Sequence, residues 1–141
     1  MSKIGDIFKA VLGICKTKEL SPHLWNLEQN KIYIDLEKVP ELQKKDGAVY
    51  LKGKGLKYPV LIIRDGDKDF LAFVNRCTHI GHRKLDPVPE KKEIRCCSVF
   101  HSTFDYNGKN LKGPAKKPLT PFPVKCVNNT LIVDVSGQYI R

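Results

Sequence analysis

Hydrophobic and polar residues alternate with a period of two over most of the chain beyond residue 30. The run KIYIDL (31–36) alternates in this way, and FLAFVN (70–75) is an apolar run preceded by turn residues. Further strands are predicted in GAVYLKG, YPVLIIRD, KEIRCC, STFDYNGKNL and PFPVKCVNNTLIVDV. Period-two alternation is typical of strands with one buried face. Short strands between strong turn signals therefore predict an all-β fold, an antiparallel β-sandwich or small barrel.

Several turn signals separate these strands. Asp65-Gly66 supplies the positive φ that a tight hairpin needs, and Asn107-Gly108 and Asn128-Asn129 are similar signals. VPELQKK predicts one helical turn between two strands. The Pro-rich stretches RKLDPVPEKKE and LKGPAKKPLTPFP predict surface loops, because proline lacks the N–H that a sheet interior requires.

The N-terminal segment has a different period. Its apolar residues recur at helical spacing and are Ile4, Ile7, Phe8, Val11, Leu12 and Cys15. This pattern predicts an amphipathic helix that packs on the protein, with partner docking or membrane-surface binding as the alternative. The run is too short to span a bilayer, and Asp6 and Lys9 interrupt it. A polar connector (17–30) follows, with Trp25 as its anchor, so we expect an N-terminal part (1–30) and a domain (31–141).

The charge is strongly positive. The chain has 25 Lys and Arg against 15 Asp and Glu, a net charge of +10. A charge of this size indicates either a solvated surface or a docking face for an acidic protein partner. Nucleic acid is the weaker interpretation, because the sequence has no arginine-rich run and no ladder of aromatic and basic residues.

The cysteine count argues against a secreted disulfide scaffold. The five cysteines are Cys15, Cys77, Cys96, Cys97 and Cys126, an odd number without a regular framework. Adjacent cysteines rarely bridge each other. We expect reduced cysteines and a cytoplasmic location. Cys96 is expected to be a core or surface thiol and Cys126 a core residue, whereas His23 is expected at the surface.

Two short boxes carry the candidate chemistry. The first box is RCTHIGH (76–82), which contains Cys77 and His79, and the second box is the segment from Cys97 to His101 within RCCSVFHSTFD (95–105). Thiolates and imidazoles are the ligands that zinc and iron–sulfur clusters use. Two interpretations compete: zinc bound tetrahedrally by all four side chains, or a [2Fe–2S] cluster with two thiolates on one iron and two imidazoles on the other.

The sequence segments around these boxes resemble those of the Rieske family over about residues 31 to 135. CTHIGH, CSVFHSTFD, the NG turn, LKGPAKKPL and the terminal LIVDV carry the resemblance. It implies antiparallel sheets with a [2Fe–2S] cluster held between two loops, and it places three ligands at Cys77, His79 and Cys97. It also matches the family's proline loop, which shields the cluster, to residues 113–115.

The second box departs from the family pattern. The family usually reads Cys-Pro-x-His-Gly-x-x-Phe-Asp, whereas this chain reads CSVFHSTFD, so Phe100 stands at the usual histidine position and His101 at the usual glycine. Neighbouring side chains of an extended segment point to opposite sides. We expect His101 to be the fourth ligand of an intact cluster. His82 is a reserve ligand, and a Rieske fold with zinc or without metal is the remaining alternative.

Ser102 and Thr103 follow the second box directly. Their hydroxyl groups are expected either to donate hydrogen bonds to cluster sulfurs, which would raise the reduction potential, or to cap the turn.

The function expected from this resemblance is electron transfer by a small Rieske-type ferredoxin or redox-complex subunit, and not stand-alone catalysis. Such a protein passes single electrons between a reductase and an acceptor, with an acidic flavoprotein, oxygenase or redox complex as partner. The sequence offers no transmembrane segment, and 141 residues are too few for an oxygenase α subunit with a second domain. The rivals are a Rieske-fold assembly protein that has lost the cluster or holds zinc, and a zinc protein that binds nucleic acid.

Overall fold

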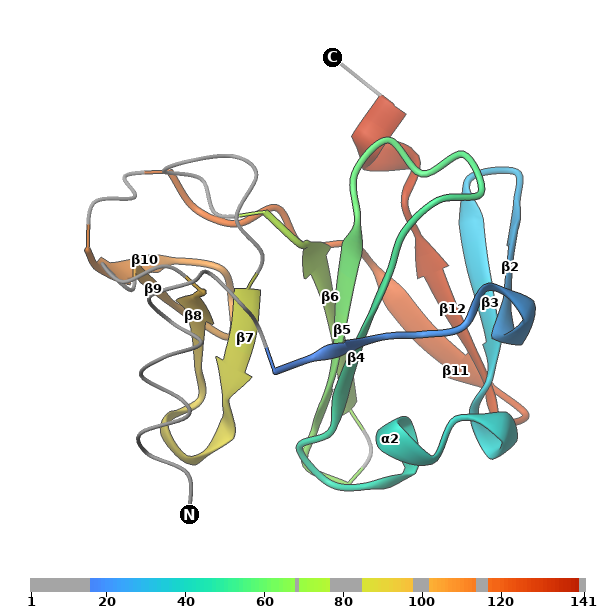
Figure 1. The fold of residues 1–141 in the computed structure, drawn as a ribbon, viewed down its shortest axis with the longest axis horizontal. Coiled ribbons are helices and arrows are strands. Elements are labelled where there is room, and N and C mark those ends of the chain that lie inside the picture. Colours follow the sequence, from blue (N-terminus) through green and yellow to red (C-terminus); the bar gives the residue numbers. More distant parts are fainter. Residues whose placement is uncertain (1–15, 68, 77–84, 98–101, 114–116, 140–141) are drawn as a thin grey trace. The chain divides into compact units, whose positions relative to one another are not determined.

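The computed structural model describes residues 16–67, 69–76, 85–97, 102–113 and 117–139 (Figure 1). The chain divides into two compact units. Unit 1 consists of residues 1–17 and 75–120, and unit 2 consists of residues 18–74 and 121–141.

Unit 2 contains two four-stranded sheets. The first has the order β1-β4-β5-β6 and the second β11-β12-β3-β2, and every pair is antiparallel except β1 with β4. The strands are β1 (Lys18–Glu19), β2 (Trp25–Glu28), β3 (Lys31–Asp35), β4 (Ala48–Leu51), β5 (Val60–Asp65), β6 (Asp69–Val74), β11 (Val124–Val127) and β12 (Thr130–Asp134). These elements confirm the predicted all-β class.

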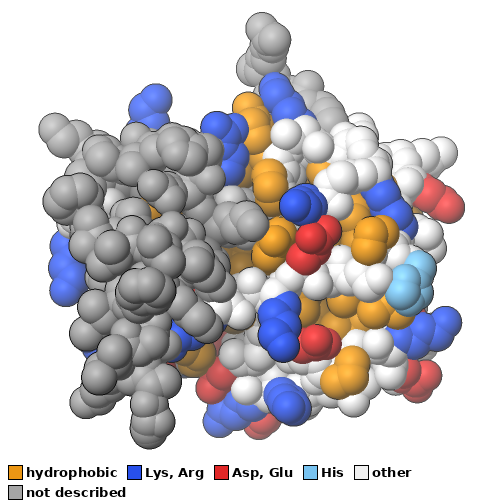
Figure 2. Space-filling model, in the orientation of Figure 1, with side chains coloured by type: hydrophobic (Ala, Val, Ile, Leu, Met, Phe, Trp, Pro, Cys, Tyr) orange, Lys and Arg blue, Asp and Glu red, His pale blue; other side chains and the backbone are white. Residues whose placement is uncertain are grey.

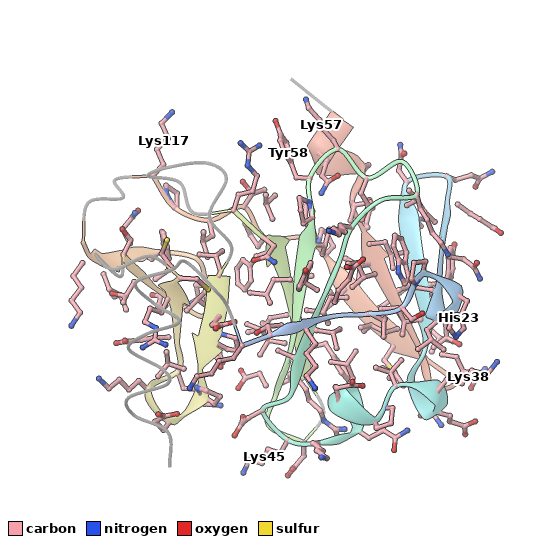
Figure 3. All side chains as sticks on the ribbon, viewed as in Figure 1. His23, Lys38, Lys45, Lys57, Tyr58 and Lys117 are labelled. Atoms are coloured by element: carbon pink, nitrogen blue, oxygen red, sulfur yellow. The ribbon has the colours of Figure 1, made fainter. Side chains whose placement is uncertain are left out.

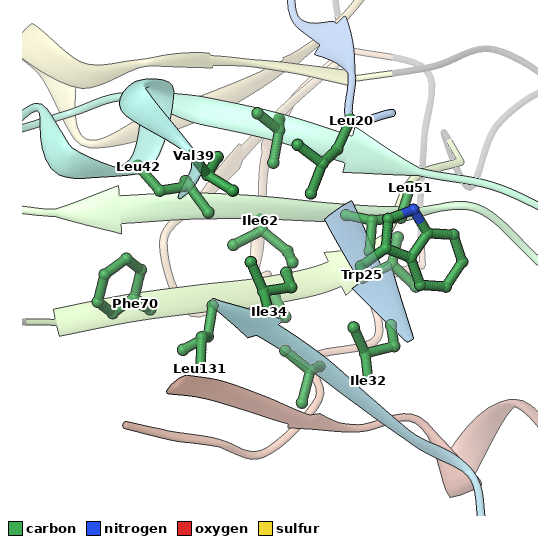
Figure 4. Packing of buried hydrophobic residues seen from close by; sticks show 14 of the residues in the cluster. Leu20, Trp25, Ile32, Ile34, Val39, Leu42, Leu51, Ile62, Phe70 and Leu131 are labelled. Atoms are coloured by element: carbon green, nitrogen blue, oxygen red, sulfur yellow. The ribbon is translucent and has the colours of Figure 1, made fainter. Parts of the chain in front are cut away.

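Alternation along β3 and β12 builds the core of unit 2. Ile32 lies opposite Val133 and Ile34 lies opposite Leu131 in the antiparallel register, and all four side chains are fully buried. Because successive side chains of a strand point to opposite faces, one face of this pair is apolar throughout. Figure 4 shows Ile32, Ile34 and Leu131 packed with residues from β4, β5 and β6.

The two sheets of unit 2 join along one seam. Phe73 at the end of β6 forms a bridge with Pro121, and the N–H of Phe122 donates to the carbonyl of Ala72 at 2.9 Å. A sandwich that is closed along one seam agrees with the predicted sandwich or small barrel.

The short elements of unit 2 also follow the sequence signals. The helical turn predicted in VPELQKK is α2 (Pro40–Gln43). Gly66, with φ of 78°, forms the predicted hairpin turn between β5 and β6, and Asn128 and Asn129, with φ of 51° and 63°, form the turn between β11 and β12.

The predicted connector at 17–30 is wrong in part, because it contains a strand. Trp25–Glu28 forms β2, which pairs with β3 around a tight turn at Gln29 and Asn30, both at positive φ. Trp25 is 1% exposed, which confirms it as an anchor. Four residues are too few for their alternation to stand out, so the strand is defined by its pairing with β3.

Cys126 is a second correction, because it is exposed and was expected in the core. It lies on β11, which is the edge of its sheet and pairs only with β12. The last three residues of β11, 125–127, are all exposed. An edge strand whose outer face is uncovered buries few side chains, and a run of sequence does not reveal whether another element covers it.

Unit 1 contains one antiparallel sheet with the order β10-β9-β8-β7. Its strands are β7 (Leu85–Val88), β8 (Glu93–Cys96), β9 (Thr103–Asp105) and β10 (Asn110–Lys112). The first of them corrects the predicted surface loop RKLDPVPEKKE, since Leu85 and Asp86 are buried. Pro87 is tolerated there because β7 is an edge strand, which forms ladder hydrogen bonds on one side only.

The remaining elements are 3₁₀ turns. They are η1 (Pro22–Leu24), η2 (Leu36–Lys38), η3 (Pro89–Lys91) and η4 (Ser136–Tyr139). The predicted N-terminal helix lies outside the described residues. Among the residues that the structure describes, no helix is long and apolar enough to cross a membrane.

Candidate functional site

The second box lies between two paired strands of unit 1. Arg95 of β8 lies opposite Thr103 of β9, and the N–H of Cys96 donates to the carbonyl of Ser102 at 2.8 Å. This pairing fixes both ends of segment 97–101, which carries two of the predicted ligands. The register of the hairpin therefore fixes the residues that flank this segment.

Cys97 is the one predicted ligand within the described residues. It is 5% exposed and disulfide-bonded, which corrects the expected reduced state of this cysteine, whereas Cys96 and Cys126 form no disulfide. Cys96 is buried, in agreement with its expected structural role. A metal-bound cysteine is a thiolate, so this disulfide has to be reduced before Cys97 can bind iron or zinc. Cys77, His79 and His101, and the reserve ligand His82, lie outside the described residues.

The first box is closed at its base by a side chain that the sequence analysis missed. Asn75 is 1% exposed, and its Oδ1 accepts a hydrogen bond from the N–H of Leu85 at 2.9 Å. This bond joins the two ends of segment 76–84, which contains Cys77 and His79. The available signal was a polar residue directly after the apolar run FLAFV and two positions before a cysteine.

The third loop begins with a close backbone contact. Gly113 has φ of 96°, and a Cβ built on it would lie 2.5 Å from the Cα of Ser102. Only glycine permits both the left-handed backbone and this approach. The predicted proline loop thus begins packed against the residue that follows the second box, and residues 114–116 lie outside the described residues.

Two hydroxyl groups follow the second box in buried positions. Ser102 is 1% exposed and Thr103 is 6% exposed, and Oγ1 of Thr103 has no hydrogen-bond partner. A buried polar group left unpaired costs about 1–3 kcal/mol, so such groups usually mark an interaction with a ligand, an ion or water. A buried cysteine and an unpaired hydroxyl group beside one loop fit a [2Fe–2S] group, whose sulfurs accept hydrogen bonds.

Asp86 is a second residue that the sequence analysis missed. Its carboxylate is buried and accepts hydrogen bonds from the N–H groups of Lys16, at 2.7 Å, and Thr17, at 3.0 Å. Asp86 therefore links residues 16 and 17, which follow the N-terminal segment, to strand β7. Its position before Pro87 made it look like part of an exposed loop.

No rival metal site exists in the part of the chain that the structure describes, because no group of three or more His, Cys, Asp or Glu side chains lies close enough to bind an ion there. His23 is exposed, as predicted, and its Nδ1 lies 2.8 Å from Oγ of Ser21. It therefore belongs to a local surface contact of unit 2.

Unit 2 contains a cavity of about 490 Å³, whose lining includes Leu42, Gln43, Arg64 and Phe70. Two of its polar side chains already bond to backbone carbonyls. Arg64 donates to the carbonyl of Leu42 at 3.0 Å, and Gln43 donates to the carbonyls of Leu36 and Glu37 at 3.0 and 2.9 Å. No predicted ligand lines this cavity, so the candidate chemistry stays with unit 1.

The net charge is divided unevenly between the units. Unit 1 has a net charge of +8 (13 basic less 5 acidic residues), whereas unit 2 has +2 (12 basic less 10 acidic residues). Figure 2 shows basic and acidic side chains interspersed on the described face of unit 2. The positive field is therefore concentrated on the unit that carries both Cys/His boxes.

Comparison with known families gives one match that spans most of the chain. Residues 33–123 match the family model described as the Rieske [2Fe-2S] domain. A search of curated proteins finds no match.

Solved structures give a similar result for the fold. The ferredoxin of carbazole 1,9a-dioxygenase from Nocardioides aromaticivorans IC177 aligns with a TM-score of 0.54 and 24% identity, over 64% of this chain and 86% of that chain. The apo form of the quaternary ammonium Rieske monooxygenase CntA aligns with a TM-score of 0.51 and 21% identity, over 67% of this chain and 30% of that chain. The plasma membrane Rieske protein PetC3 from Synechocystis PCC 6803 is 28% identical over 60% of this chain and 84% of that chain, with a TM-score of 0.49.

Proposed function

The chain belongs to the Rieske [2Fe-2S] domain family, and we propose that it carries single electrons between a reductase and an acceptor protein, such as an oxygenase or a larger redox complex. A Rieske domain holds a [2Fe–2S] cluster, so this cofactor belongs to the chain and the protein is an electron-transfer Rieske protein. The family match carries this conclusion, and the buried Cys97 supports it.

We assign the cluster to Cys77 and Cys97 on one iron and to His79 and His101 on the other. When bound, the cluster supplies a centre that accepts and returns one electron, with family potentials of roughly −150 to +300 mV. Two hydrogen bonds fix the ends of the loops that carry these ligands. The bond between Asn75 and Leu85 closes the first loop, and the bond between Cys96 and Ser102 closes the second.

Ser102 is buried and Gly113 approaches it closely, so this part of the backbone is tightly packed. A site whose polar surroundings are already fixed reorganises little when its charge changes, which favours fast electron transfer.

The proposal is tested by the spectrum and metal content of anaerobically purified protein. We expect about two irons and two sulfides per chain, and after reduction an EPR signal with an average g of about 1.9, as a mixed thiolate and imidazole ligand set requires. Colourless protein without iron would refute electron transfer. Zinc at one equivalent would then favour the structural or assembly function, which the displaced histidine of the second box also suits.

The fourth ligand is tested by a pair of histidine variants. His101→Ala is expected to abolish the signal of the Rieske centre, because an imidazole ligand is lost, whereas His82→Ala is expected to retain it. Histidine hyperfine couplings in pulsed EPR and the iron content are the measurements. The reverse result would assign the ligand to His82.

The proposed partner is a protein with an acidic face, either a flavoprotein reductase or an oxygenase. The net charge of +8 on unit 1 supports this class, because opposite charges steer association toward the unit that holds the cluster. We propose a cytoplasmic location, which the unbridged thiol of Cys126 supports.

A further inference from the structure

Asn75 combines two observations that the predicted ligand set does not explain. Its side chain is 1% exposed and accepts the N–H of Leu85 through Oδ1. Its other polar atom, Nδ2, is buried and has no hydrogen-bond partner. Most buried polar groups are paired, so a buried amide with an unused N–H group requires an explanation.

The orientation of this amide is fixed by its neighbour. The backbone N–H of Leu85 is only a donor, so it must face the oxygen of Asn75 and cannot face the nitrogen. Rotation of the amide by half a turn would place two donors against each other and break this bond. Nδ2 is therefore held away from Leu85, with two N–H groups available to a different acceptor.

The sequence places this donor beside the first box, since Asn75 precedes Cys77 by two residues. An independent observation comes from the second box, where Oγ1 of Thr103 is also buried and unpaired. Each of the two loops that carry predicted ligands thus has an unused donor at one of its ends. The sulfurs of an iron–sulfur cluster are acceptors that could satisfy both.

We propose that Asn75 is a positioning residue of the cluster, an inference that rests on the proposed function. Its Oδ1 fixes the base of the first loop, and its Nδ2 donates a hydrogen bond to a sulfur of the bound [2Fe–2S] cluster. Hydrogen bonds to cluster sulfurs stabilise the reduced state, which carries one more negative charge. Asn75 therefore raises the reduction potential.

The experiment compares Asn75→Leu and Asn75→Asp with wild-type protein. Leucine removes both polar atoms and keeps the same branched arrangement of heavy atoms, whereas aspartate keeps an acceptor for the N–H of Leu85 and loses the amide donor. The matched controls are Asn107→Leu and Asn107→Asp, at an exposed asparagine of the same unit. The measurements are the midpoint potential, the rate of iron loss to a chelator, and the exchangeable-proton couplings of the reduced cluster by pulsed EPR in H₂O and D₂O.

We expect Asn75→Leu to lower the midpoint potential, to remove one exchangeable-proton coupling and to accelerate iron loss several-fold. Asn75→Asp is expected to lose the same coupling but to release iron at close to the wild-type rate, because the base of the loop stays closed. Both Asn107 variants are expected to match the wild type in all three measurements.

The outcomes separate this inference from the proposed function. Wild-type protein without iron and sulfide would overturn the proposed function before any variant is compared. If the wild type holds the cluster, an unchanged coupling pattern in Asn75→Asp would overturn the inference and assign the unused N–H to water. If the leucine variant fails to fold or to bind iron, the aspartate variant decides the question, because it preserves the bond to Leu85.

Discussion

At the scale of single residues, contacts at the ends of the three loops fix the backbone around the candidate site. Asn75 bonds to Leu85 across the first loop, Cys96 bonds to Ser102 across the second, and Gly113 packs against Ser102 at the start of the third. None of these contacts requires a side chain to touch the metal. They reduce the conformational freedom that the loops would otherwise lose when the cluster binds.

Gly113→Ala tests the start of the third loop. Gly53 is the matched control, because it also has a positive φ, of 87°, but an added Cβ would meet nothing within 4 Å. We expect Gly53→Ala to lower the free energy of unfolding by about 1–2 kcal/mol, the cost of a left-handed alanine. Gly113→Ala adds the clash with Ser102, so a larger loss and an altered visible CD spectrum of the cluster are expected. Equal losses in the two variants would show that Ser102 moves aside without cost.

Asp134 provides a test of pH dependence. Its side chain accepts hydrogen bonds from Oγ of Ser136, at 2.6 Å, and from the N–H of the same residue, at 3.0 Å. These bonds, with a smaller contribution from the charge of Lys31, hold the pKa of Asp134 below its ordinary value of 3.8. The stabilisation is present above pH 3.8 and is lost as the pH falls through the lowered pKa.

Ser136→Ala is expected to raise the pKa of Asp134 toward its ordinary value, because the larger of the two causes is removed. The wild type is expected to be more stable than the variant above pH 4, about where an aspartate ordinarily titrates, and this advantage should disappear in stronger acid. Carboxyl NMR titration measures the pKa directly. Ser21→Ala, which removes a hydroxyl group bonded to His23, serves as the control. An unshifted titration in Ser136→Ala would exclude the hydroxyl as the cause.

At the scale of elements, strands are recognised from sequence when both alternation and turn residues are present. β3 and β12 satisfy both conditions and lie where they were predicted, and β5 is an apolar run that was predicted from the turn residues after it. β2 and β7 lack one of them: β2 is only four residues long, and β7 contains Pro87. Their pairing with β3 and β8 supplies the hydrogen bonds that define them, and that information lies elsewhere in the chain.

Trp25→Ala tests whether β2 belongs to the domain. Trp25 is 1% exposed, and the ammonium group of Lys54 lies 4.8 Å from the centre of its ring. We expect a loss of about 3–5 kcal/mol in the free energy of unfolding, the usual cost of removing a buried aromatic ring. Asn26→Ala, at an exposed position of the same strand, is expected to stay within about 0.5 kcal/mol. Since Trp25 is the one tryptophan of the chain, unfolding is followed by far-UV CD.

The predicted boundary at residue 31 can be examined in the same assay. A chain that begins there lacks β2 and Trp25, and it is expected to unfold at a lower denaturant concentration than a chain that begins at residue 16. Equal midpoints would show that the domain starts at residue 31, as the sequence predicted.

At the scale of the whole molecule, net charge acts on a partner before the two surfaces touch. The excess of basic residues follows the division into units, with +8 on unit 1 and +2 on unit 2. Figure 3 shows Lys117 of unit 1 and Lys38 of unit 2, both of which are exposed. If association is steered by the field of unit 1, the same charge reversal should have different effects at these two positions.

We expect Lys117→Glu to slow reduction of the cluster by a flavoprotein reductase with an acidic surface several-fold at low salt. Lys38→Glu is expected to have a smaller effect, because it changes the net charge equally but on the other unit. Stopped-flow reduction at two ionic strengths is the measurement, and the difference should shrink in high salt because ions screen exposed charges. Identical rates for both variants would show that the charge of unit 1 does not guide docking.

The sequence by itself determined the all-β class, most of the strands and turns, the two Cys/His boxes and the family. Alternation, turn residues and ligand spacing are local properties, so a short window of the chain contains all that is needed to recognise them. The tertiary structure decided which side chains close the loops and which surfaces are covered. Asn75 and Asp86 are buried because they bond to residues beyond their own strand, and Cys126 is exposed because β11 is an edge strand. Neither property can be read from a short window of sequence.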